Sequence, residues 1–102
     1  VFAFMDLASG AHTYPEAGGR NNSERDMFLV AGGAAVENFL ISVSSQGYGS
    51  AWISSTLFCA ETVRNHLGLH SSLLPLGAVA IGVPESIPSQ RPPKSAVGFL
   101  LD

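Results

Sequence analysis

Short apolar runs alternate along the chain with longer, more mixed segments. The runs that fit buried strands cover residues 1–7, 51–53, 73–83 and 97–101. Two segments have helical length. One covers residues 25–46 after Ser23 as N-cap, and the other covers 58–67 and is ended by Gly68. This order of elements fits an α+β or α/β fold, and 102 residues make one domain.

The longer predicted helix is apolar on almost every side, with Met27, Val30, Val36, Phe39 and Ile41 on different faces. A chain of this size has little protein to wrap around such a helix, so we expect another subunit to cover part of it. Its small residues at 32–35 would let another backbone approach closely. Its polar pair, Glu37 and Asn38, would then be buried and would need partners, structural rather than catalytic ones.

The C-terminal part of the chain is rich in proline. Pro84, Pro88, Pro92 and Pro93 hold residues 84–93 extended and away from the body of the domain. The apolar run at 97–101 follows this arm. It either returns to its own sheet or crosses to a partner.

Composition and charge narrow the classes of protein. Hydrophobic residues make up 46% and charged residues 13% of the chain, which excludes intrinsic disorder. The net charge is −3 and the five basic residues are scattered, so nucleic-acid binding is not expected. The most apolar stretch, 27–43, is interrupted and too short, so we expect no membrane span. With Cys59 alone, no internal disulfide and no cysteine-rich metal site is possible, and a cytoplasmic location fits.

The sequence contains no self-sufficient catalytic motif. The three histidines have no metal-like spacing, and we expect surface or capping roles for them and no metal site: they are His12, His66 and His70. Cys59 is expected to be a buried, inert thiol rather than a nucleophile. Taken alone, Trp52 would be a core residue.

The segment 47–55, Gly-Tyr-Gly-Ser-Ala-Trp-Ile-Ser-Ser, follows a helix that contains Glu37-Asn38-Phe39-Leu40. Together they resemble the nitroreductase superfamily of FMN-dependent oxidoreductases, in which a Gln-Asn-Leu-Leu-like stretch leads into Gly-Leu-Gly-Ser-Cys-Trp-Ile-Gly. Residues 76–82 and the arm with Arg91 also match, so the resemblance covers nearly the whole chain. The runs 11–15 and 52–58 look most like the C-terminal domain of the coenzyme F-420-0:gamma-glutamyl ligase family.

This resemblance implies a fold and an activity. The fold is an α+β nitroreductase-like flavin fold, with a central mixed sheet flanked by helices and a C-terminal arm and strand exchanged in a homodimer. The chain, residues 1–102, looks like the C-terminal half of such a domain. The activity it implies is FMN-dependent reduction of a planar substrate, with a deazaflavin precursor in coenzyme F-420 biosynthesis as the specific case. The alternative is a non-catalytic dimerisation or regulatory module of such a ligase.

The resemblance also implies a cofactor site. Trp52, Ile53, Ser54 and Ser55 would lie along the flavin, with the N–H groups of both serines at its N5 and O4 atoms. Arg91 would pair with the flavin phosphate, which needs a cation or a helix N-terminus. Two plainer interpretations stay open. The hydroxyls at 54–56 would only cap the next helix, and Arg91 would only be a solvated charge on the arm.

Overall fold

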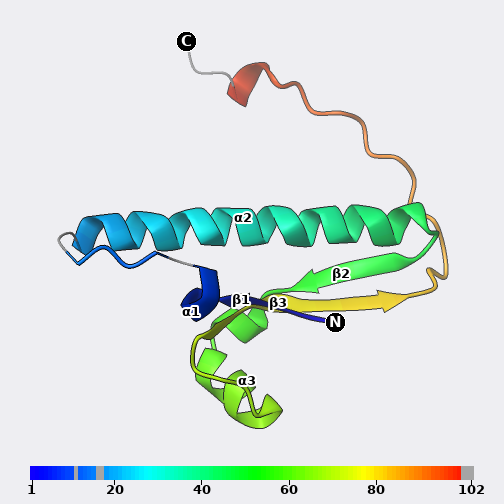
Figure 1. The fold of residues 1–102 in the computed structure, drawn as a ribbon. Helices are drawn as coiled ribbons and strands as arrows, with labels where there is room; N and C mark the ends of the chain where they lie inside the picture. Colours follow the sequence, from blue (N-terminus) through cyan, green and yellow to red (C-terminus); the bar gives the residue numbers. More distant parts are fainter. Residues whose placement is uncertain (11, 16–17, 100–102) are drawn as a thin grey trace.

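The computed structural model describes residues 1–10, 12–15 and 18–99 (Figure 1). The elements follow one another along the chain as β1 (Phe2–Asp6), α1 (Leu7–Gly10), α2 (Gly18–Ser45), β2 (Gly49–Ile53), η1 (Ser55–Leu57), α3 (Ala60–Leu67), β3 (Leu73–Gly82) and η2 (Val97–Phe99). Here η1 and η2 are single turns of 3-10 helix. The predicted strands at 51–53 and 73–83 and the predicted helix at 58–67 are therefore confirmed, with small shifts at their ends.

The three strands form one sheet in the order β1-β3-β2. β3 pairs with both neighbours in antiparallel orientation, so our expectation of a mixed sheet is wrong for the described strands. β3 is central because it carries the buried run Pro75-Leu76-Gly77, together with Val79. α2 lies along one side of this sheet, and α3 lies on the other side, near the start of β3 (Figure 1). The small sheet and the long helix beside it fit the α+β class.

α2 begins earlier than the sequence suggested. Ser23 is not the N-cap, because it lies inside the helix and its hydroxyl donates to the Gly19 carbonyl at 3.2 Å. The loop before the helix is held by Asn21, whose side-chain oxygen accepts from the Tyr14 N–H at 2.8 Å. The Asn21 side-chain nitrogen donates to the Tyr14 carbonyl at 3.0 Å. These two bonds tie the loop to the first turn, so the helix needs no serine cap at residue 23.

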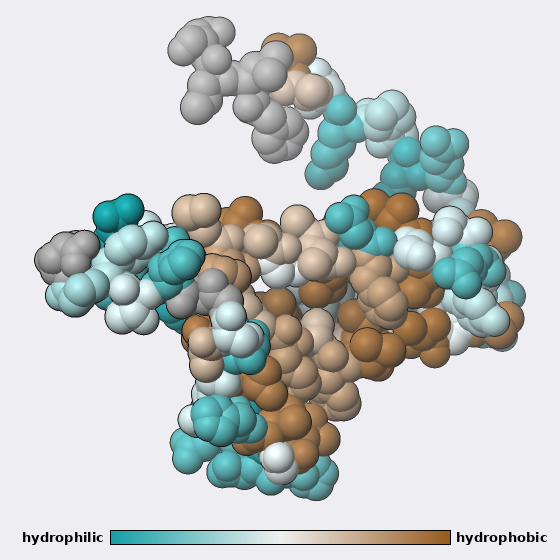
Figure 2. Space-filling view, in the orientation of Figure 1, coloured by the Kyte–Doolittle hydropathy of each residue, from teal (hydrophilic) through white to brown (hydrophobic). Residues whose placement is uncertain are grey.

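α2 is covered by its own chain along a narrow strip. Of its apolar side chains only Val36 and Val43 are buried, whereas Met27 is 68%, Val30 75% and Ile41 58% exposed. Figure 2 shows hydrophobic residues exposed along the helix and over the sheet. Glu37 and Asn38 are exposed, so our expectation that they are buried and paired is wrong. The expectation that this helix has more apolar surface than its own chain covers is confirmed.

Residues 19–45 of α2 are also long and apolar enough to cross a membrane. Our exclusion of a span on length was therefore wrong, because the helix extends beyond the stretch 27–43. Core helices of soluble proteins meet the same criteria of length and composition. The finding by itself assigns no membrane role to α2.

The described chain exposes more surface than a compact domain of its size. Its accessible surface is 7926 Å², compared with about 5,500 Å² for a compact monomer of this mass. Its radius of gyration is 17.4 Å, compared with about 13 Å for a compact chain of this length. The open side of α2 and the arm, which runs apart from the body, both contribute to this exposed surface (Figure 1).

The predicted strand at 97–101 is wrong over Val97–Phe99, which form η2. Residues 100–101 lie outside the described part of the chain. The arm carries Val97 away from the sheet, so no neighbouring strand offers ladder hydrogen bonds. The Val97 N–H instead donates a hydrogen bond to the nearby Ser95 hydroxyl, at 3.3 Å. Figure 1 shows the arm and η2 apart from the sheet.

The two adjacent glycines of α2 have different surroundings. A Cβ at Gly32 would lie 2.6 Å from Cδ1 of Leu76, so Gly32 allows α2 to approach β3 closely. A Cβ at Gly33 would meet nothing within 4 Å. Gly32 therefore makes room for the Leu76 side chain of its own chain. We had expected it to make room for another backbone.

This difference predicts opposite effects of alanine at the two positions. Gly33→Ala should stabilise the fold by up to about 1 kcal/mol, because alanine favours a helix interior. Gly32→Ala gains the same propensity but overpacks Leu76, at a cost of about 1–3 kcal/mol, so it should stabilise less or destabilise. Urea unfolding of both variants tests this, and equal stabilities would contradict the packing described.

The carboxylate of Asp6 joins two corners of the fold. It accepts hydrogen bonds from the Ser9 hydroxyl at 2.8 Å, the Ala8 N–H at 3.0 Å and the Ser72 hydroxyl at 3.0 Å. These donors, Ser9 foremost, hold the pKa of Asp6 below its usual 3.8. Because the ionised form accepts these bonds, it stabilises the start of α1 and its link to the segment before β3.

We therefore expect Asp6→Asn to lower the free energy of unfolding at neutral pH. The difference from the wild type should shrink as the pH falls below 3.8 and through the lowered pKa, because protonation removes the same interaction. Urea unfolding at neutral pH and at about pH 3 measures this. A difference that does not change with pH would mean that the ionised carboxylate contributes nothing.

Candidate functional site

The predicted site residues from Trp52 to Ser55 lie where β2 ends. β2 is an edge strand of the described sheet, and its last pair is Ile53 with Ala78 of β3. On β3, the main chain of Val79 exchanges hydrogen bonds with Val1, on the β1 side. Successive residues of an antiparallel strand direct their main-chain hydrogen bonds to opposite sides. Since Val79 bonds toward β1, its neighbour Ala78 bonds toward β2, to Ile53. The main-chain N–H and C=O of Trp52, next to Ile53, therefore point away from β3. The site therefore begins on an open edge.

Directly after this edge, two main-chain donors are free. The carbonyls of Ser54 and Ser55 accept the N–H groups of Leu57 at 3.0 Å and Phe58 at 3.1 Å. The N–H groups of the two serines donate to no acceptor among the described residues. Both serines are exposed. The turn thus presents two adjacent N–H groups, which do not titrate, to whatever lies against it.

The serine hydroxyls do not account for this turn. Ser54 is at the N-cap of η1, but its side chain makes no capping hydrogen bond, and the N-cap of α3 is Cys59. The hydroxyl oxygen of Thr56 is buried without a hydrogen-bond partner. The capping interpretation of residues 54–56 therefore fails at Ser54.

The indole of Trp52 contacts β3 rather than filling the core. Its Nε1–H donates to the Leu76 carbonyl at 3.0 Å, and the residue as a whole is 41% exposed. Beside it, Gly77 has a φ of +146° and leaves room for the indole. Our interpretation of Trp52 taken alone, as a core residue, is wrong.

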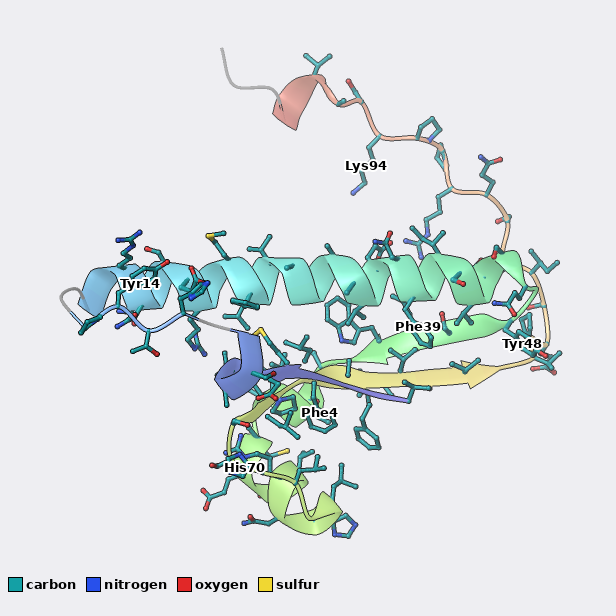
Figure 3. All side chains as sticks on the ribbon, in the orientation of Figure 1. Phe4, Tyr14, Phe39, Tyr48, His70 and Lys94 are labelled. Atoms are coloured by element: carbon teal, nitrogen blue, oxygen red, sulfur yellow. The ribbon has the colours of Figure 1, made fainter. Side chains whose placement is uncertain are left out.

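Arg91 lies apart from the other predicted site residues. It is exposed on the arm, and α2 runs between the arm and the sheet (Figure 1). Figure 3 shows the same separation, with Lys94 of the arm on one side of α2 and Phe4 of β1 on the other. Within one chain, the structure does not bring Arg91 to the end of β2.

The remaining candidate side chains are on the surface. His12, His66 and His70 are exposed, and Nδ1 of His70 lies 3.0 Å from the Ser72 hydroxyl. No cluster of three metal-ligating side chains occurs in the part of the chain that the structure describes. Cys59 is exposed, so our expectation of a buried thiol is wrong: the residue lies at the N-cap of α3, and its Sγ lies 3.6 Å from the Ser55 carbonyl.

Sequence reasoning missed Gly77 as a residue of this site. The available signal was a glycine in the middle of the apolar run Leu76-Gly77-Ala78, which marks a bulge or a close approach within a strand. The glycine makes room for the indole of Trp52.

Comparison with known families identifies the family of this chain. The chain matches the Nitroreductase family over residues 3–83, from β1 to just beyond β3, and it belongs to that family. It is therefore an oxidoreductase-type, flavin-binding domain, and members of the family typically bind FMN and are commonly dimeric. The match includes Trp52 to Ser55 and ends before Arg91.

Proposed function

We propose that this chain is an FMN-dependent oxidoreductase domain whose turn after β2 holds the flavin ring. The main chain from Trp52 to Ser55 lies along the ring, and the N–H groups of Ser54 and Ser55 donate to N5 and O4. The observation that carries this proposal is the pair of adjacent N–H groups of two exposed serines, which donate to no acceptor among the described residues. They lie at the end of an edge strand within the matched residues.

These donors suit a redox cofactor. When bound, FMN supplies the hydride chemistry, and the protein supplies position and electrostatics. Main-chain N–H groups neither titrate nor react, and fixed donors stabilise negative charge that develops at the atoms they face. Ser54 and Ser55 would thus both orient the ring and favour its reduced form.

A homodimer would complete the site. α2 exposes apolar side chains that its own chain does not cover, Met27, Val30 and Ile41 among them, and a second chain would bury them. Because α2 separates the arm from the turn after β2, Arg91 would reach the flavin phosphate in the partner's site. Exchange of the extended arm between two chains would place it there.

The substrate class rests on the resemblance of residues 11–15 and 52–58 to the ligase domain. We propose a planar substrate that stacks on the flavin, with a deazaflavin precursor in coenzyme F-420 biosynthesis as the specific case, and a cytoplasmic location. The Tyr14 ring lies 3.9 Å below the Arg20 guanidinium carbon, and Asn21 fixes its main chain. The loop before α2, which belongs to the ligase-like run, thereby holds the aromatic ring of Tyr14 in a fixed position.

A second candidate is a non-catalytic dimerisation or regulatory module of a ligase. The distance of Arg91 from the turn within one chain favours it, because a domain without a phosphate contact holds FMN weakly. Colour separates the two candidates. The purified full-length protein should be yellow, or should become yellow and retain the colour after addition of FMN. A protein that stays colourless after such treatment supports the module.

Ser54→Pro tests the main-chain contact. The φ of Ser54 is −88°, close to that of proline, and Ile53 before it is in a strand, as a residue preceding proline prefers. The substitution therefore removes the N–H with little strain. We expect FMN binding by the full-length protein to weaken at least about tenfold, or the flavin potential to shift.

Ser54→Ala is the matched control, because alanine keeps the N–H and removes only the hydroxyl. It should bind FMN as the wild type does. Fluorescence titration with FMN and redox titration measure both variants. A folded Ser54→Pro protein with normal affinity and potential would refute the contact.

A further inference from the structure

A β-bulge lies beside the candidate flavin site. In the ladder between β1 and β3, Ala3 pairs with Gly77 and the next residue, Phe4, pairs with Pro75, so Leu76 has no partner on β1. A bulged residue leaves the ladder locally interrupted, and bulges are frequent next to active sites. Leu76 is buried, so its carbonyl oxygen needs a hydrogen-bond donor from elsewhere in the fold.

The indole of Trp52 supplies that partner. Its Nε1–H donates to the Leu76 carbonyl at 3.0 Å, across from the neighbouring strand β2. The indole can reach it because Gly77 has no side chain: a Cβ there would clash with Nε1, and would lie 2.6 Å from Cδ1 of Trp52 and 3.1 Å from the Ile53 carbonyl. With a φ of +146°, Gly77 also has a backbone conformation that side-chain-bearing residues rarely adopt.

This contact lies where β2 stops. Ile53 and Ala78 form the last pair, so Ser54 falls opposite Gly77 and turns into a helical conformation with φ −88° and ψ −4°. Trp52 therefore anchors β2 to β3 two residues before the first free N–H group. The direction of that group depends on where the strand is anchored.

We propose that Trp52 and Gly77 are positioning residues for the flavin site: the indole, seated on Gly77 and bonded to the bulged Leu76, fixes the direction of the Ser54 and Ser55 N–H groups. This proposal rests on the proposed function for its effect on FMN. In the proposed function only the main chain of Trp52 lies along the flavin. The present proposal adds a role for its side chain, which acts on the flavin indirectly by orienting the turn. The large exposed fraction of Trp52 agrees with a role beyond filling the core.

Trp52→Phe in the full-length protein tests this. Phenylalanine keeps an aromatic ring but lacks the donor for Leu76. Tyr48→Phe is the matched control, because it removes a polar group from an exposed aromatic residue just before β2. Gly77→Ala is a second variant, in which the added Cβ displaces the indole.

The first readout is the NMR order parameter of the Ser54 and Ser55 amides without FMN. We expect order parameters of about 0.85 in the wild type and in Tyr48→Phe, and a fall toward about 0.6 in Trp52→Phe. The second readout is FMN affinity, which should fall about tenfold in Trp52→Phe and not in the control. If Gly77→Ala does not fold, Trp52→Phe alone decides.

Two results would overturn the proposal. One is a Trp52→Phe protein whose Ser54 and Ser55 amides stay as rigid as in the wild type. The other is a mobile turn that binds FMN with wild-type affinity. A wild-type protein that binds no FMN would instead reject the proposed function, and the order parameters would still decide whether Trp52 fixes the turn.

Discussion

The whole structure depends on one constraint: a single strand, β3, holds the buried core together. Pro75, Leu76 and Val79 are buried on it, whereas β1 adds only Met5 and α2 only Val36 and Val43. A helix of 28 residues with apolar side chains on most sides cannot be covered by a sheet of three short strands. The uncovered side of α2 is the physical reason to expect a second chain, and it is present in the described chain independently of any family resemblance.

The same arrangement explains the properties of the candidate site. β3 pairs with β1 and β2, so β2 is left at the edge with its outer main-chain groups open. The turn that follows is outside the ladder and presents the N–H groups of Ser54 and Ser55. α2 lies between this turn and the arm, so one chain holds the two parts of the proposed flavin site, the turn and Arg91, on opposite sides of a helix (Figure 1). The proposed site, which uses both, would therefore be shared between two chains.

The sequence was sufficient where the signal is local. Gly47 and Gly68 ended the two helices as expected, each with a positive φ, and the apolar runs located β2 and β3. The family resemblance, carried by residues 34–40 and 47–55, agreed with the match. The family match does not test the individual flavin-site residues, so their roles stay predictions.

Features that depend on distant contacts were not predictable in this way. The start of α2 depends on Asn21 holding Tyr14, which no N-cap pattern reveals. The bulge at Leu76 depends on the pairing of β1, and the exposure of Cys59 depends on how η1 joins α3. An apolar run such as 97–101 becomes a strand only where a neighbouring strand accepts it, and the arm keeps Val97–Phe99 away from the described sheet.

The central claim is that two chains build one flavin site, with the turn from one and Arg91 from the other. Mixed dimers test it most directly, with Ser54→Pro in one chain and Arg91→Ala in its partner, purified through two different tags. If the site is shared, one of the two sites in the mixed dimer is intact, so it should bind one FMN per dimer with wild-type affinity. Neither parent homodimer should bind so tightly. A mixed dimer that binds FMN no better than its parents would contradict the shared site.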